Sequence, residues 1–147
     1  MSATLIGIAR RDKPRAPMEL LERAVITYDA GIVGDCRGRT PDRNVTLIFR
    51  EDWEAACRDL GRELPWVTRR ANLLVEGLKG FKHVGAQLKV GDTLLEVTEE
   101  NPPCGVMDIL AAGLRVALQP DWRGGVACRV LQDGTVALGC TVALVNH

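Results

Sequence analysis

Residues 84–100, VGAQLKVGDTLLEVTEE, place two short apolar segments on either side of Gly91-Asp92. Alternation of apolar and polar residues is typical of strands that bury one face, and a Gly-Asp pair between two such segments marks a turn. We therefore predict two strands joined at Gly91-Asp92. Short strands linked by glycine turns favour a β-rich barrel or sandwich.

The segments outside this region repeat the pattern. We predict closing strands over 126–146, with a hairpin signal at Asp133-Gly134 and a second turn or bulge at Gly139. Further strands are predicted over 4–10, in the AVITY segment 24–28, over 44–49 and around 72–75. The sequence thus indicates about seven or eight short strands.

Helices are fewer and short. Residues 51–61, EDWEAACRDLG, begin with acidic residues, carry apolar residues at helical spacing and end at Gly61, which predicts a helix. A second short helix is predicted over 103–114, after Pro102 and Pro103. Two or three helices are too few for a repeating βαβ pattern. We expect a β-rich mixed α/β fold, barrel-like, with a few short peripheral helices.

Composition indicates a single domain over residues 1–147, of ordinary globular character. The chain is 46% apolar and 26% charged, and 19 basic residues balance 19 acidic ones. Net charge therefore gives no reason to expect binding to nucleic acid or to a membrane surface. No apolar run is long enough to span a bilayer, and the N-terminus lacks a secretory signal pattern. We expect a cytoplasmic protein, and the sequence leaves its oligomeric state open.

Cysteine and histidine restrict the possible chemistry. Five cysteines, at positions 36, 57, 104, 128 and 140, are odd in number and contain no CxxC pair. This argues against a zinc ribbon or a thioredoxin-type site, and no zinc is expected. The two histidines, His83 and His147, exclude an HExxH metal site.

Cys104 is the leading candidate for a reactive side chain. The two prolines before it hold the approach extended, and a helix N-terminus after it would favour the thiolate. A thiolate is both a nucleophile and a soft metal ligand. The alternative is that Cys104 is a small buried apolar residue, and spacing alone leaves the two interpretations equally weighted. Cys57, Cys128 and Cys140 are assigned to packing.

Arginines at turns form a second group of candidates. Arg37, Arg39 and Arg43 follow the turn GIVGD; Arg69 and Arg70 precede a strand; Arg123 precedes Gly124-Gly125. Guanidinium groups and glycine-turn amides suit phosphate or carboxylate, although single arginines are more often solvated surface residues. Asp35 pairs with these arginines or caps a turn. Asn72 binds a ligand or satisfies loop backbone.

The order of motifs resembles a known family. The motifs are GIVGD (31–35), DRNVTLIF (42–49), RRANLLVEGL (69–78), VGAQLKVGDTLLEVTEENPPC (84–104), GLRVAL (113–118) and RGGVACRVLQDGTVALGCTVAL (123–144). Together they are similar to a stand-alone MOSC domain, the family named for the C-terminal domain of molybdenum cofactor sulfurases. The resemblance implies a barrel-like fold related to the β-barrel domain of pyruvate kinase.

The resemblance also implies roles for individual residues. Cys104 matches the family's signature cysteine, which carries sulfur or ligates molybdenum. Cofactor-binding positions on the pterin-phosphate side are then assigned to Gly34, Asp35, Arg70, Asn72, Arg123 and Gly124, and Arg43 is added to them from the group of arginines at turns. One departure is Cys36, which stands near where many relatives have histidine. The chain contains no pyridoxal-phosphate domain, so no site for that cofactor is expected.

Three functions follow from the resemblance. The first is a molybdenum cofactor binding or sulfur-carrier module that uses the Cys104 thiolate in an arginine-lined anion pocket. The second is a molybdenum-dependent reductase of N-hydroxylated substrates, which needs an external electron donor. The third is a non-catalytic adaptor that docks on a sulfurase or molybdoenzyme, with Cys104 only packed. The expected partner is the cofactor itself or such an enzyme.

Overall fold

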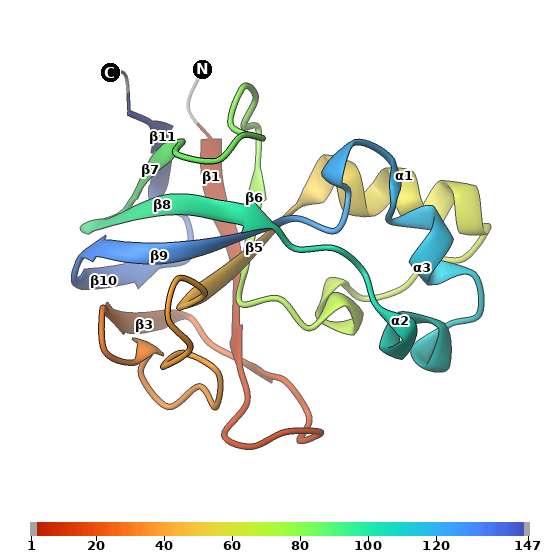
Figure 1. The fold of residues 1–147 in the computed structure, drawn as a ribbon, viewed down its shortest axis with the longest axis horizontal. Helices are drawn as coiled ribbons and strands as arrows, with labels where there is room; N and C mark the ends of the chain where they lie inside the picture. The colour runs from red at the N-terminus through yellow and green to blue at the C-terminus, as the bar shows by residue number, and fades with distance from the viewer. Residues whose placement is uncertain (1–2, 146–147) are drawn as a thin grey trace.

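A closed β-barrel forms the larger part of the protein. The structure, a computed structural model, describes residues 3–145 and shows the barrel with short helices gathered on one side (Figure 1). The barrel strands are β1 (Ala3–Arg10), β5 (Val45–Phe49), β6 (Leu73–Glu76), β7 (Gln87–Val90), β8 (Thr93–Glu100), β9 (Val126–Gln132) and β11 (Thr141–Leu144). They pair in the order β11, β7, β8, β9, β5, β6, β1, and β1 pairs again with β11 to close the sheet. The expectation of a β-rich, barrel-like fold is confirmed.

The two strands predicted around Gly91-Asp92 are β7 and β8. They pair antiparallel, with Val90 opposite Thr93 across the turn. In β8, Thr93, Leu95 and Val97 are buried while the residues between them are half-buried. Because of this alternation, one face of the hairpin points into the barrel, where its apolar residues join the main apolar core.

One neighbouring pair in the barrel differs from the rest. Strands β5 and β6 run parallel, with Leu47 opposite Leu73, whereas the other barrel pairs are antiparallel. Parallel strands cannot be joined by a tight turn and need a crossover. Residues 50–72 supply it with α1 (Arg50–Leu60) and the 3₁₀ helix η1 (Trp66–Arg69).

The hairpin predicted at Asp133-Gly134 is wrong. Strand β10 (Gly134–Ala137) does not fold back on β9; it pairs antiparallel with β3 (Arg23–Thr27), which in turn pairs with β4 (Gly31–Ile32). The Asp133 carboxylate instead accepts the Tyr28 backbone N–H at 2.8 Å. Gly139 does turn the chain before β11, with φ of 89°. A short strand, β2 (Glu19–Leu20), pairs with the end of β1.

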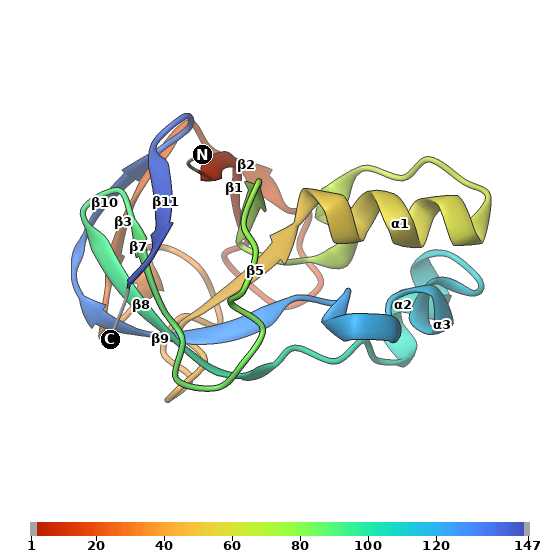
Figure 2. The ribbon, with the colours of Figure 1, turned by 90° about the horizontal axis from the view of Figure 1, so that it is seen from above.

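The helices pack together beside the barrel (Figure 2). The helix predicted over 51–61 is α1, which ends in a left-handed Gly61. The helix predicted over 103–114 is instead two, α2 (Gly105–Leu110) and α3 (Leu114–Ala117), because Gly113 has φ of 90°; η2 (Pro120–Trp122) follows. Trp53, Met107 and Leu114 share a second apolar core. Within residues 3–145, no helix is long and apolar enough to cross a membrane.

The loop before β5 folds tightly on itself. A Cβ on Gly38 would lie 1.6 Å from the Ala30 carbonyl oxygen, and a Cβ on Gly31 would lie 2.2 Å from the Asn44 carbonyl oxygen. The buried Asn44 side chain donates to the carbonyls of Tyr28 and Gly38 and accepts the Val130 N–H. Asn44 therefore joins this loop to barrel strand β9.

Candidate functional site

Cys104 lies at an exposed junction between the barrel and the helices. It follows the segment Asn101-Pro102-Pro103 that leaves β8, and it immediately precedes α2. Pro103 is buried, whereas Cys104 is exposed and its backbone is extended, with φ of −119°. The Cys104 carbonyl accepts the Met107 N–H at 3.0 Å. The thiol is therefore presented to solvent by a fixed backbone and is not packed in the core.

Arg69 is a buried cation beside Cys104. Its side chain donates to the carbonyls of Gly124 (2.9 Å) and Asn101 (2.7 Å), and it contacts the Met107 sulfur at 3.9 Å. Burial lowers the pKa of Arg69 to about 10, and the nearby Cys104 charge opposes that shift. At neutral pH the group stays charged. Arg69 belongs to the predicted group of candidate arginines but received no cofactor-binding assignment, because no local pattern distinguishes a buried arginine from an exposed one.

Arg43 bonds to the same segment before Cys104 as Arg69 does. Its guanidinium donates to the Glu99 carboxylate at 2.7 Å and to the Asn101 side-chain oxygen at 2.9 Å. Its positive charge also acts on Arg69. Of the positions predicted for cofactor binding, Arg43 and Gly124 therefore lie close to Cys104.

Gly124 is sterically required at this junction. A Cβ there would lie 2.6 Å from the Asn101 carbonyl oxygen, and 3.2 Å from both the Arg69 Nη2 and the Pro103 Cδ. The first of these distances is too short for any side chain. The glycine thus lets three segments meet beneath Cys104.

We expect Gly124→Ala to lower the free energy of unfolding by about 1–3 kcal/mol, because the added methyl group pushes on the Asn101 backbone. Urea unfolding measures the change. Gly105→Ala is the matched control, since a Cβ there meets nothing within 4 Å, and it should stay within about 0.5 kcal/mol of the parent. Equal stability of the two variants would contradict the close packing.

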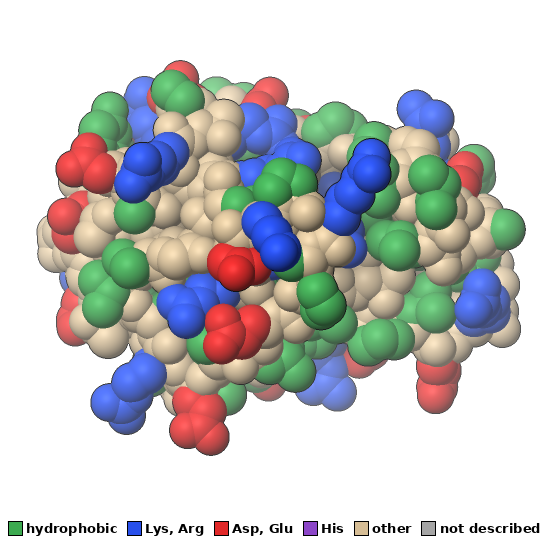
Figure 3. Space-filling view, turned by 90° about the horizontal axis from the view of Figure 1, so that it is seen from below, with side chains coloured by type: hydrophobic (Ala, Val, Ile, Leu, Met, Phe, Trp, Pro, Cys, Tyr) green, Lys and Arg blue, Asp and Glu red, His purple; other side chains and the backbone are tan. Residues whose placement is uncertain are grey.

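A second group of cations, here called the arginine cluster, consists of Arg11, Arg37 and Arg70. Arg70 has a left-handed backbone, with φ of 66°, and donates to the Ala16 carbonyl at 3.1 Å. Burial, followed by the charges of Arg11 and Arg37, lowers the pKa of Arg70, while Cys36 opposes the shift. Lys and Arg side chains gather between the barrel and the helices on the face seen from below (Figure 3).

The turn containing Gly34 and Asp35 supports this cluster. The Asp35 carboxylate accepts the backbone N–H groups of Arg11 (3.1 Å) and Arg37 (3.3 Å). Asp35 therefore acts as a turn cap, one of its two predicted roles. Gly34 borders a hollow of about 380 Å³ that is also lined by basic and acidic residues, Arg10, Arg11, Asp12 and Glu19. Three predicted positions, Gly34, Asp35 and Arg70, thus come together here.

The side chains of Asn72 and Arg123 bond to other parts of the chain. The Asn72 side chain, 6% exposed, accepts the N–H and hydroxyl of Thr46 and donates to the Ala9 carbonyl. Arg123 donates to the Asp59 carboxylate at 2.6 Å and to the Ala117 carbonyl at 3.1 Å, which ties α1 to α3. Both side chains are occupied by internal bonds.

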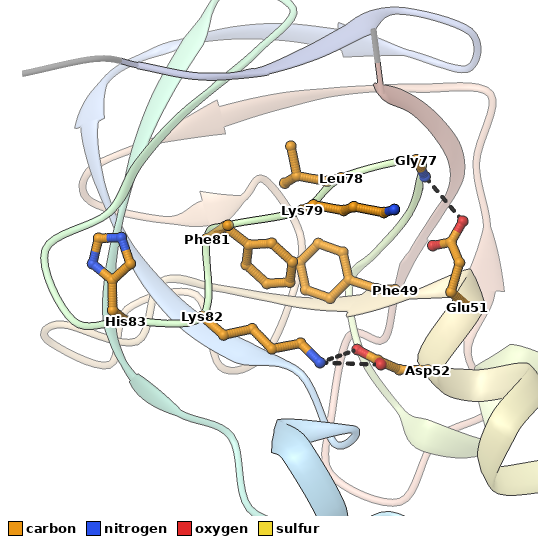
Figure 4. Close-up of a pocket in the computed structure, with 10 residues that line it drawn as sticks. Phe49, Glu51, Asp52, Gly77, Leu78, Lys79, Phe81, Lys82 and His83 are labelled. Atoms are coloured by element: carbon orange, nitrogen blue, oxygen red, sulfur yellow. Dashed lines mark hydrogen bonds and ion pairs between the residues drawn. The ribbon is translucent and has the colours of Figure 1, made fainter. Parts of the chain in front are cut away.

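A larger hollow than the one beside Gly34 is lined by none of the residues around Cys104. Its volume is about 530 Å³, and it lies between the start of α1 and residues 77–83 (Figure 4). The Phe49 and Phe81 rings pack at its floor, 3.9 Å between centroids, and Lys82 pairs with Asp52 at 3.0 Å. Burial raises the pKa of Asp52, and Lys82 partly offsets the shift. None of the positions predicted for cofactor binding lines this pocket.

The described side chains do not by themselves assemble a metal site. Within residues 3–145, no group of three or more His, Cys, Asp or Glu side chains is arranged to hold a metal ion. A metal held at Cys104 would therefore need most of its ligands from a cofactor, and the neighbouring cations suit an anionic one. The donor set fits a cofactor that brings its own ligands.

Comparison with known proteins identifies the family. A family model for the MOSC domain matches residues 35–143. The crystal structure of the YUAD protein from Bacillus subtilis superposes with a TM-score of 0.82 at 19% identity, over 97% of this chain and 94% of that one. YiiM from Escherichia coli gives 0.76 at 19% identity, over 100% of this chain and 71% of that one. YiiM from Geobacillus stearothermophilus gives 0.77 at 18% identity, over 98% and 75%. No curated protein matches the sequence.

Proposed function

Because the chain belongs to the MOSC domain family, its function is related to the molybdenum cofactor, and we propose that it binds this cofactor through Cys104 and the nearby arginines. In this proposal Cys104 supplies the thiolate, and the arginine cluster holds the anionic pterin-phosphate part. Arg43 and the Gly124 backbone border the Cys104 end. Gly34 and Asp35 hold the turn at the other end.

One observation carries the proposal. Consecutive residues at the end of η1 supply positive charge to two places: Arg69 lies beneath the exposed Cys104, and Arg70 lies among Arg11 and Arg37. No carboxylate among the described residues is ion-paired with either side chain. Clustered guanidinium groups without carboxylate partners are suited to an anionic ligand.

The chemistry of the cofactor agrees with this arrangement. It carries a phosphate at one end and molybdenum with sulfur ligands at the other, and a thiolate is a good ligand for such a metal. When bound, the cofactor would supply redox or sulfur chemistry at the metal. The chain's own residues would bind the cofactor, orient it and present the Cys104 sulfur.

We expect protein expressed with molybdate to retain molybdenum, and Cys104→Ser to lower its molybdenum content at least about tenfold, because serine is a poor soft-metal ligand. Elemental analysis of purified protein measures the effect. Cys57→Ser is the matched control, since Cys57 packs in the helical core, and its content should stay within about twofold of the parent. Both variants must keep the parent's circular dichroism. Unchanged molybdenum in Cys104→Ser would refute the proposed ligand.

Two finer functions can be separated with the same protein. A sulfur carrier accepts the outer sulfur of a donor persulfide on Cys104 and releases the donor thiolate, so intact mass rises by one sulfur atom. A reductase instead turns over N-hydroxylated substrates when an electron donor is supplied. The adaptor function assumed that Cys104 is packed, and the exposed thiol removes that support.

A further inference from the structure

We propose that Arg69 makes the Cys104 site selective for anions. Its hydrogen bonds fix the segment that carries Cys104, and its unpaired positive charge attracts an anionic group that reacts with the thiol. This inference rests on the proposed function for its biological meaning, but its physical basis is independent. It gives a positioning role to Arg69, a residue to which the family resemblance assigned none. The bonds, the burial and the charge of the Arg69 side chain support it.

The bonds of Arg69 hold the site's backbone. Two of its nitrogens donate to the carbonyls of Asn101 and Gly124, which lie in the segment before Cys104 and in the turn before β9. The contact with Met107 adds α2, whose first residue follows Cys104. One buried fork therefore joins the three segments that surround the thiol.

These bonds leave the charge of Arg69 uncompensated. Its three contacts are two neutral carbonyls and one thioether, and a guanidinium has five N–H groups. Arg69 is only 6% exposed, and no carboxylate among the described residues pairs with its guanidinium. A buried charge without a counter-ion is costly, and an anion bound beside it reduces that cost.

Arg43 differs from Arg69 in its exposure and in its ion pairing. It is more exposed, and it pairs with Glu99 at 2.7 Å, so its charge is largely neutralised. The net positive charge beside Cys104 therefore comes mainly from Arg69. Removing the Arg69 charge should weaken the attraction of anions to the thiol more than removing the Arg43 charge does.

Two alkylating reagents of similar size test this inference. Iodoacetate is anionic and iodoacetamide is neutral; with both, the Cys104 sulfur bonds to carbon and iodide leaves. Peptide mass spectrometry gives the rate constant at Cys104 for each reagent. Their ratio cancels the intrinsic nucleophilicity of the thiol, so it reports only the local attraction for negative charge.

We expect Arg69→Gln to lower the iodoacetate-to-iodoacetamide ratio about threefold or more relative to the parent protein. Arg69→Lys keeps the charge and should keep the ratio within about twofold, although it loses the planar fork. Arg43→Gln should change the ratio less than Arg69→Gln does. Arg58→Gln, at an exposed position of α1, should leave it unchanged. A loss of structure alone would not produce this order.

An unchanged ratio in a folded Arg69→Gln variant would overturn the inference. If that variant does not fold, Arg43→Gln decides: a ratio within about twofold of the parent supports the inference, and a fall of about threefold or more, which would assign the attraction to Arg43, refutes it. Molybdenum content is measured separately. Protein without molybdenum but with the expected ratios would reject the proposed cofactor and leave the role of Arg69 standing.

Discussion

Asn72→Ala is expected to lower the free energy of unfolding by about 2–5 kcal/mol. The substitution removes the acceptor of the partly buried Thr46 N–H and the donor to the buried Ala9 carbonyl, so both backbone groups lose this partner. Each such group costs about 1–3 kcal/mol. These bonds join β5, β6 and β1, so the loss falls on the barrel itself. Urea unfolding followed by circular dichroism measures it.

The control for this prediction is Gln132→Ala. Gln132 is exposed and makes one side-chain bond, to the Asp92 carbonyl, so its loss should change stability by less than about 0.5 kcal/mol. The experiment also bears on function. An Asn72→Ala variant of normal stability that loses molybdenum would return Asn72 to the binding role that the resemblance implied.

Gly38→Ala should be comparably damaging, with a loss of about 3 kcal/mol or more. The new Cβ would lie 1.6 Å from the Ala30 carbonyl oxygen, so the segment around Gly38 must move away from the segment around Ala30. That movement would also pull on the Asn44 bonds to the Gly38 and Tyr28 carbonyls. Because the same loop carries Arg37, the arginine cluster should be disturbed as well.

Thermal unfolding of Gly38→Ala and Gly61→Ala separates crowding from backbone strain. Gly61 has φ of 75° but open space around its Cβ, so alanine there should cost only about 1 kcal/mol. Gly38 is crowded without needing a positive φ. Similar melting temperatures for the two variants would show that the loop before β5 relaxes easily, which would contradict its tight folding around Gly38.

Local sequence patterns predicted the regular elements well and the long-range pairings less well. The helix at 51–61 and the strands around Gly91-Asp92 depend on neighbouring residues, and both are confirmed. The Asp133-Gly134 hairpin failed because β10 finds its partner, β3, more than a hundred residues earlier. Turn chemistry at two residues cannot exclude a distant strand that offers a better fit.

The candidate site shows the same limit more sharply. Arg69 and Arg70 are identical neighbours, yet Arg69 ends a 3₁₀ helix and is buried, whereas Arg70 adopts a left-handed backbone and joins a different group of side chains. Only tertiary structure separates their roles. For Asn72 the sequence pattern was equally consistent with two roles, because a polar residue before an apolar strand can contact a ligand or form an internal bond.

The parallel pairing of β5 with β6 has a consequence for how such proteins diversify. The crossover that it requires carries both Arg69 and Arg70 on its return to the barrel. Insertions or deletions in this connection would re-aim the two guanidinium groups while every barrel strand kept its register. One rigid barrel could in this way acquire new ligand preferences through changes in the single connection between β5 and β6.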